Sequence, residues 1–356
     1  MPIIMKKYSC LWICSALMLV LGISSCNDSN EDVKGIETII PSTLLQKAFY
    51  MAKDDTQQPV WLQEKIANNP YLNVYFSDKN GGHYILEYPN RTHTTCELYD
   101  TNGNLQSPTT QQALDATLSA GIPWTCTHIY SYPIKAGTEE WKSLTSKERV
   151  EKLQLSDNLL GIMRTEDLIK VCLDFPYATD FYAFDDYQSG FKYIYNEFNG
   201  LQELMSRNDL AEPFLLFLDV NWQKTEMMKS QEDLVRGEYT LLSMIFKIML
   251  AQDAVINQMS REQIHQMLDL CIRNNNIETT QSDFWGAWHS EGTWYIYTKV
   301  IKNKGGFLFK DDREIRMFND YTEKPIPYLY KEGDEYYYLF TDDFKARVLE
   351  YVKTFR

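Results

Sequence analysis

The spacing of apolar residues changes twice along this chain, and these changes limit the folds that it can adopt. Between residues 73 and 130, short runs rich in aromatic and β-branched residues are separated by turns that contain Gly and Asn, which is typical of an antiparallel sheet. From Thr138 the spacing becomes helical, and strand-like runs return after residue 276. We therefore predict an α+β fold with a small antiparallel β domain, a helical domain, and C-terminal antiparallel strands with a closing helix.

The same spacing predicts the individual elements. Pro59 favours the start of one helix, and Thr145–Glu148 and Ser260–Gln263 have the capping pattern that begins others. Helices are expected at residues 44–53, 59–67, 187–205, 209–220, 231–259 and 344–354. Strands are expected at residues 73–76, 84–88, 95–99, 125–130, 293–301, 306–310 and 335–340. The helix at 231–259 is apolar on more than one face, so we expect it at the centre of the helical domain.

These patterns divide the 356 residues into five segments. They are a signal peptide at 1–25, an acidic tether at 26–43, a small α+β domain at 44–133, a helical domain at 134–275, and C-terminal strands with a helix at 276–356. A chain of this length has room for two or three domains.

The N-terminus has the features of a signal peptide. Two lysines precede an apolar run from Tyr8 to Gly22, which has the length of a signal-peptide core and is shorter than the ~20 residues of a membrane span. The next residues, Ile23-Ser24-Ser25-Cys26, resemble a bacterial lipobox. The resemblance implies cleavage before Cys26 and acylation of its thiol, with palmitate for example. An ordinary secretory peptide and an N-terminal anchor helix are the alternatives.

The segment after Cys26 is polar and acidic. Asn27–Asp32 shows no periodicity and is expected to be a solvated tether. Its acidic residues resemble the export signals on surface lipoproteins of the Bacteroidota. This resemblance implies an outer-membrane lipoprotein of the cell envelope, exposed at the cell surface and attached to the membrane through its lipid.

The charge of the chain argues against one class of partner. The sequence has 49 acidic residues against 35 lysines and arginines, a net charge of −14 at pH 7. Phosphate backbones are bound by clustered Lys and Arg. Nucleic acid is therefore not expected as a partner.

Four cysteines remain when the signal peptide and the lipidated Cys26 are set aside. We predict a disulfide between Cys96 and Cys126, which lie in consecutive predicted strands of one small domain, where closing the loop contributes about 3–4 kcal/mol. Cys172 and Cys271 fall in helical patterns and are expected to be separate buried thiols, with a pairing between them as the alternative. No cysteine spacing suggests zinc.

Two parts of the chain resemble proteins of one phylum. A segment of uncharacterised envelope proteins of the Bacteroidota is similar to this chain at Arg164–Leu168, Cys172–Pro176, Gly190-Phe191 and Phe198–Leu204. A small domain of lipoproteins of that phylum is similar at Trp61-Leu62, Cys96–Asp100 and Trp124–Cys126. Neither resemblance implies an activity. Some proteins with the helical segment continue into an Asn-Cys-His motif suggestive of a cysteine hydrolase, and this sequence has no such triplet.

The sharpest catalytic candidate is the pair Cys126 and His128. Residues i and i+2 of a strand point to the same face, so thiol and imidazole can approach and give an activated thiolate. The alternative is that Cys126 bonds to Cys96 and His128 is a cross-strand surface residue. The sequence lacks HExxH, GxSxG, GxGxxG and the phosphate loop, which removes the usual support for zinc proteases, serine hydrolases and nucleotide enzymes.

Trp285, Trp288 and His289 form the candidate ligand site. They lie in a run dense in large rings, at the junction between helical and strand-like patterns. Rings with polar groups nearby bind sugars or peptides through stacking and hydrogen bonds. The alternative is packing at a domain interface.

Three acidic segments offer oxygen atoms to calcium. They are Asp180–Asp186, Asp311–Glu314 and Asp100–Asn104. None has the alternating ligand spacing of a calcium loop, and a hairpin turn accounts for Asp100–Asn104. We therefore expect no metal and no cofactor.

These features together favour a non-catalytic binding or interaction module. Its partner would be a glycan, a peptide or a protein, in addition to the membrane that receives the lipid. The competing hypothesis is an envelope hydrolase of the cysteine type, with Cys126 and His128 as its pair.

Overall fold

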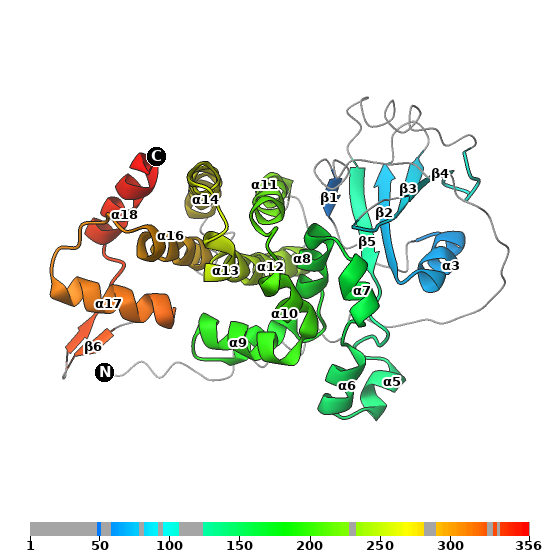
Figure 1. The fold of residues 1–356 in the computed structure, drawn as a ribbon, viewed down its shortest axis with the longest axis horizontal. Coiled ribbons are helices and arrows are strands. Elements are labelled where there is room, and N and C mark those ends of the chain that lie inside the picture. Colours follow the sequence, from blue (N-terminus) through cyan, green and yellow to red (C-terminus); the bar gives the residue numbers. More distant parts are fainter. Residues whose placement is uncertain are drawn as a thin grey trace.

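A sheet, a helical middle part and a C-terminal helix follow one another along an elongated molecule (Figure 1). The computed structural model describes residues 48–50, 58–77, 82–91, 95–106, 124–227, 233–280, 290–325, 330–332 and 335–355. The combination of an antiparallel sheet with a larger helical part confirms the predicted α+β class. One hydrophobic core runs from the sheet to the last helix.

Five strands form the sheet at one end of the molecule. In spatial order they are β1 (Ala48–Tyr50), β5 (Trp124–Tyr130), β2 (Tyr71–Ser77), β3 (His83–Tyr88) and β4 (Thr95–Asp100). β1 runs parallel to β5, and every other neighbouring pair is antiparallel. The four strands predicted between residues 73 and 130 are confirmed.

The helix predicted at 44–53 is wrong over the part of that range that the structure describes. Ala48, Phe49 and Tyr50 form β1 and pair with residues 124–126 of β5. A short apolar run fits a helix and a strand equally well. Pairing with a strand more than 70 residues away decides the outcome, and local spacing does not contain that information.

Both faces of the sheet are covered. Helix α3 (Val60–Asn68) begins after Pro59, as predicted, and buries Leu62 and Ile66 against Val74 and Leu86 on one face. The opposite face, which includes Tyr75, belongs to the main core shared with the helices. The sheet is therefore a layer between α3 and the helical part (Figure 1).

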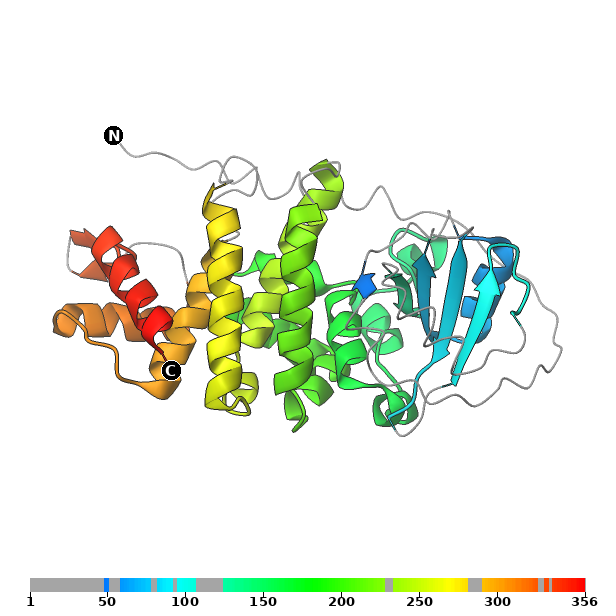
Figure 2. The same cartoon turned by 90° about the horizontal axis from the view of Figure 1, so that it is seen from above.

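The helical part contains eleven helices in the region 134–280 that the structure describes. They are α5 (Glu139–Ser143), α6 (Ser146–Lys152), α7 (Asp157–Ile162), α8 (Thr165–Leu173), the 3-10 helix η3 (Ala178–Ala183), α9 (Tyr187–Glu197), α10 (Asn199–Ser206), α11 (Ala211–Met227), α12 (Asp233–Leu250), α13 (Asp253–Ile256) and α14 (Arg261–Thr280). Figure 2 shows α11 and α14, which contact each other, as long neighbouring helices.

Both predicted capping boxes are present. The Thr145 hydroxyl accepts from the Glu148 backbone N–H at 3.3 Å, and the Glu148 carboxylate accepts from the Thr145 N–H at 2.7 Å. Ser260 and Gln263 make the same exchange at 3.2 and 2.9 Å. These reciprocal bonds satisfy backbone donors that a helix start leaves open.

The helix predicted at 187–205 is two helices, because the chain is extended at Phe198 (φ −127°, ψ 113°). The Phe198 ring is buried and stacks on Phe175, with 4.2 Å between the ring centroids. The next residue, Asn199, bonds through its side chain to the backbone N–H and C=O of Leu155. Tertiary contacts therefore interrupt a pattern that is helical throughout.

The C-terminal part differs most from prediction. Residues 293–301, predicted as a strand, lie in helix α16 (Glu291–Lys304), and residues 306–310, also predicted as a strand, form neither helix nor strand. Residues 292–301 are all buried. A helix that is buried on every side has no polar face, so the 3.6-residue period that identifies a helix is missing.

Helix α17 (Asp312–Glu323) was not predicted. It is followed by the antiparallel strands β6 (Tyr330–Glu332) and β7 (Glu335–Tyr337), of which only β7 lies in a predicted strand, and α18 (Asp342–Thr354) confirms the predicted closing helix.

The helix predicted at 231–259 is two helices, α12 and α13, because the chain leaves the helix at residues 251–252. Helix α12 contacts α8, α9, α13 and α16, which confirms the predicted central position for this part. Among the helices that the structure describes, none is both long and apolar enough to span a membrane.

Candidate functional site

The predicted Cys96–Cys126 disulfide is not formed, and both residues are buried thiols. Cys96 lies on β4 and Cys126 on β5, with β3 and β2 between them. Three strand spacings amount to roughly 14 Å, whereas a disulfide needs Cα atoms within about 7 Å. The predicted bridge requires β4 and β5 to be neighbours because they are consecutive in the chain, whereas β5 pairs with the opposite edge of β2. Cys172 and Cys271 are separately buried thiols, as predicted.

Cys126 and His128 do not share a face of the sheet. Val74 and Tyr75 are consecutive in β2, and they pair with His128 and Cys126, respectively. Thr127 is therefore an extra residue on β5, a β-bulge. The bulge reverses the expectation that residues i and i+2 point the same way, and it places Cys126 on the Tyr75 face and His128 on the Val74 face.

The thiol of Cys126 is also unsuited to nucleophilic attack. It is fully buried and donates a hydrogen bond to the His128 backbone carbonyl, with 3.6 Å between the atoms. Burial raises its pKa, and the nearby Asp167 and Glu87 carboxylates raise it further. A catalytic cysteine needs a lowered pKa and access to substrate, so the geometry does not favour the hydrolase.

The other predicted site residues fall in two groups. Cys26, Trp285, Trp288 and His289 lie outside the described residues, and nothing in the structure tests them. The acidic segments are described, and several of their carboxylates serve local structure. Asp186 caps α9, Asp311 caps α17, and Asp100 accepts three bonds within its own turn, as the turn interpretation predicts. Within the described part of the chain, no cluster of His, Cys, Asp or Glu could hold a metal.

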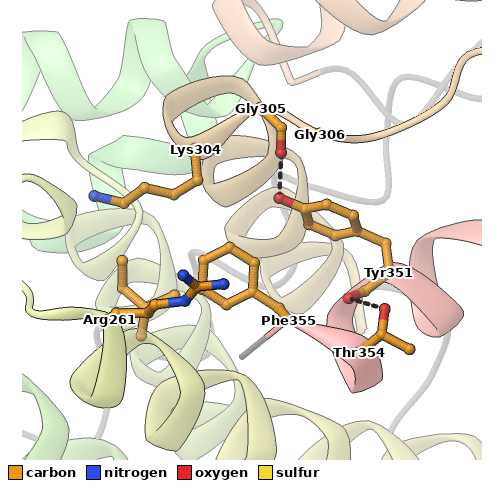
Figure 3. A pocket seen from close by; sticks show the side chains of 8 residues that line it. Arg261, Lys304, Gly305, Gly306, Tyr351, Thr354 and Phe355 are labelled. Atoms are coloured by element: carbon orange, nitrogen blue, oxygen red, sulfur yellow. Dashed lines mark hydrogen bonds between the residues drawn. The ribbon is translucent and has the colours of Figure 1, made fainter.

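A cavity of about 500 Å³ lies at the end of the molecule opposite the sheet. We name it the C-terminal pocket. Its lining consists of Arg261, Ile264, Lys304, Gly305, Gly306, Tyr351, Thr354 and Phe355. The volume is within the range of small-molecule sites. Figure 3 shows these side chains around the opening.

The ends of three helices build the C-terminal pocket. Ser260 caps α14, so that Arg261 is the first residue of that helix. Gly305 ends α16 with φ 68°, so that Lys304 is the last residue of that helix. Residues with a side chain rarely adopt this φ, and glycine is therefore the suitable residue to end the helix here. The last turn of α18 supplies the third wall.

Hydrogen bonds and ring contacts fix the walls in place. The Tyr351 hydroxyl donates to the Gly305 carbonyl at 2.6 Å, and the Thr354 hydroxyl donates to the carbonyls of Glu350 and Tyr351. The guanidinium carbon of Arg261 lies 5.6 Å from the centroid of the Phe355 ring. Burial raises the pKa of Tyr351, although Arg261 opposes this effect, so its phenol is a neutral donor.

The electrostatic character of the pocket differs from that of the chain. Two of its lining residues, Arg261 and Lys304, are cations and none is acidic, although the whole chain carries a net charge of −14. Neither cation forms an ion pair with a carboxylate of the described residues. The described lining also contains no thiol, imidazole or carboxylate, the usual groups of nucleophilic and acid–base catalysis. The arrangement is suited to binding an anionic group.

A second polar cluster joins the sheet to the helices. We name it the seam, and it consists of Tyr71, Asn73, Tyr75, Glu87, Arg164 and Asp167. The Arg164 guanidinium donates to both oxygens of Glu87 at 3.1 and 2.9 Å and to Asp167 at 2.8 Å. Both carboxylates are completely buried. Burial alone would lower the pKa of Arg164, but Asp167 and Glu87 raise it.

The tyrosines complete the seam. The Tyr71 hydroxyl donates to Asp167 at 2.7 Å and accepts from the Arg164 backbone N–H at 3.1 Å. The Tyr75 hydroxyl donates to Glu87 at 2.9 Å. The cluster is enclosed, and its two carboxylates share the Arg164 guanidinium and each accept from one tyrosine hydroxyl, so its role is to fix the sheet against the start of α8 rather than to receive a ligand.

The sequence contained partial signals for the C-terminal pocket. The capping pattern after Ser260 placed Arg261 at a helix start, and Gly305-Gly306 after Lys304 is a helix-ending signal. Because residues 293–301 are predicted as a strand, Gly305-Gly306 is interpreted as a turn between two strands and not as the end of a helix. Nothing in the spacing indicated that the last turn of α18 would meet these two ends.

Comparisons with protein-family models, with curated proteins and with solved structures find no match to this chain. The class of the protein therefore follows from its own geometry. It is an α+β protein with a cationic pocket at one end and a sealed ionic cluster near the other.

Proposed function

We propose that this protein is a non-catalytic binding module that a lipid on Cys26 holds at the outer membrane of a bacterial cell envelope. The observation that carries the binding role is the C-terminal pocket, which combines ligand-sized volume with two cations that have no carboxylate partner among the described residues. The lipobox-like residues 23–26 support the attachment. The acidic tether supports display at the cell surface.

Binding is tested by thermal unfolding of the mature chain. A ligand that binds only the folded state raises the melting temperature, and at a hundred times its Kd it adds about 2.7 kcal/mol of stability. We expect at least one member of a panel of glycans, peptides and small anions to produce such a shift. A panel without any shift would count against the binding role.

Attachment is tested by substitution of the acceptor thiol. In cells grown with labelled palmitate, we expect Cys26→Ala to lose the label and to leave the membrane fraction. Cys10→Ala is the matched control, because Cys10 lies within the predicted signal peptide, and it should keep both. Label retained by Cys26→Ala would contradict the proposal.

The cysteine hydrolase is separated from the binding module by alkylation. Iodoacetamide should leave Cys126 unmodified in the native protein and modify it after unfolding in guanidinium, because the folded thiol is buried and its pKa is raised. Modification without a reductant would also show that Cys96 and Cys126 are not bridged. Rapid alkylation of native Cys126 would restore the hydrolase as a candidate.

A further inference from the structure

We infer that the C-terminal pocket selects small molecules in which a phosphate or carboxylate group is joined to an apolar or aromatic portion. This inference rests on the proposed binding function and names the class of ligand. It depends on how the two cations, the rings and the polar groups of the pocket are arranged.

Arg261 is held near the opening of the pocket by a ring contact. Its guanidinium carbon lies over the Phe355 ring, 5.6 Å from the ring centroid (Figure 3). A cation–π contact of this kind uses no N–H donor, so the donors of Arg261 remain available to a ligand. A planar fork of donors matches the paired oxygens of a carboxylate or phosphate and binds them with two parallel hydrogen bonds.

Lys304 supplies the second positive charge. It is exposed at the end of α16, and no ion pair with the described residues occupies its ammonium group. An ammonium is a point charge on a flexible stem, so it can follow an anion that Arg261 has oriented.

The remaining walls suit an apolar portion. Ile264 and the rings of Tyr351 and Phe355 line the cavity, and the Thr354 hydroxyl oxygen can still accept a hydrogen bond because its proton is directed to backbone carbonyls. A volume of about 500 Å³ is larger than a bare phosphate or carboxylate ion would fill. The two cations by themselves would be satisfied by an inorganic anion as the ligand. The apolar walls favour an anion that also carries an apolar portion.

The test is calorimetric titration of the mature chain with four probes. Phenyl phosphate and benzoate carry the inferred groups, benzyl alcohol is the neutral analogue, and inorganic phosphate lacks the ring. We expect phenyl phosphate or benzoate to bind at one site, and both benzyl alcohol and inorganic phosphate to bind about tenfold more weakly or worse.

Variants locate the binding in the pocket. Arg261→Gln and Lys304→Gln should each lower the affinity for the organic anion by about tenfold. Lys353→Gln makes the same change of charge on α18 outside the lining, and it should leave the affinity unchanged. Vesicles of phosphatidylglycerol distinguish a lipid headgroup from a soluble ligand. If the vesicles bind the wild-type protein and do not bind Arg261→Gln, the anionic group that the pocket recognises belongs to a lipid.

The inference is overturned if neither organic anion binds, if both pocket variants bind as tightly as the wild type, or if benzyl alcohol binds equally well. A neutral ligand that still raises the melting temperature would then preserve the binding function while removing the anion specificity. If the wider panel also produces no shift, the binding function fails together with the inference.

Discussion

The seam and the C-terminal pocket each contain an arginine, but the two guanidinium groups are in opposite situations. Arg164 has 11% of its side chain exposed and bonds to two carboxylates that have no exposure. Arg261 is exposed, lies over a ring, and has no carboxylate partner in the described part of the chain. The Arg164 guanidinium is therefore paired with carboxylates inside the protein, and the Arg261 guanidinium is not paired with any carboxylate of the described residues.

The two arginines therefore have different roles: Arg164 stabilises the fold, and Arg261 is available for binding. A buried ion pair is neutral to stability until one partner is removed, when the remaining charge becomes very costly. An exposed cation without a partner contributes little to stability, and its hydrogen-bonding capacity is available to a ligand. Substitutions in the seam should therefore change folding, and substitutions in the pocket should change binding.

The largest effect is expected from Arg164→Met. The change leaves Glu87 and Asp167 buried without their cation, which should lower the free energy of unfolding by about 3–5 kcal/mol. Urea unfolding measures the loss. Lys142→Gln, which breaks the exposed pair with Glu139, is the control and should have no measurable effect. A loss below about 1 kcal/mol for Arg164→Met would mean that the ion pairs of the seam do not contribute substantially to stability.

A smaller loss is expected from Tyr71→Phe. The hydroxyl donates to the Asp167 carboxylate and accepts from the Arg164 backbone N–H, so its removal should cost about 1.5–3 kcal/mol in the same measurement. Tyr193→Phe changes an exposed tyrosine and should be neutral. Equal stability of the two variants would mean that the phenol does not contribute to the seam.

Glu166, whose carboxylate lies 3.7 Å from the Arg164 guanidinium of the seam, makes the stability of this region depend on pH. Burial and the adjacent Asp167 raise its pKa in the folded state, so the folded protein holds this proton more tightly than the unfolded chain, in which Glu titrates near pH 4.3. The stability from the protonated form is present below about pH 4.3 and is lost as the pH rises through the folded pKa.

Glu166→Gln should therefore gain stability relative to the wild type as the pH rises from about 4 to 8. We expect this gain to be smaller than the loss in Tyr71→Phe, because Glu166 retains some exposure and Arg164 lies 3.7 Å away. Urea unfolding across this pH range measures it. A difference between the two proteins that does not change with pH would contradict the raised pKa.

The seam and the pocket also show which features of the structure can be predicted from the sequence. The strands from 73 to 130 were predictable, because their alternation and their Gly and Asn turns are local signals. The seam was not predictable, since Glu87 and Arg164 are 77 residues apart and no spacing relates them. The bulge at Thr127 was equally hidden, because it depends on how β5 meets β2.

The pocket was hidden for a different reason. Its lining comes from the start of α14, the end of α16 and the end of α18, and α16 was interpreted as a strand. The buried run from Thr293 to Ile301 is rich in aromatic and β-branched residues, which favour strands when burial on all sides removes the helical period. The candidate residues Trp285, Trp288 and His289 remain a prediction.

The smallest effect on stability is expected in the pocket. Arg261→Gln and Lys304→Gln should each lower the free energy of unfolding by no more than about 1 kcal/mol, because neither cation has a carboxylate partner among the described residues and the contact of Arg261 with Phe355 is made by an exposed side chain. A loss above about 2 kcal/mol for either variant would place that cation in the fold and would weaken the contrast with Arg164.

Protection of Lys304 from acylation is the sharpest test of whether the C-terminal pocket binds an organic anion. An amine-reactive ester labels exposed lysines, and peptide mass mapping reports the extent of labelling at each residue. We expect saturating phenyl phosphate to slow the labelling of Lys304 and to leave that of Lys353 unchanged. Equal labelling of Lys304 with and without the anion would contradict the assignment of the C-terminal pocket as the binding site.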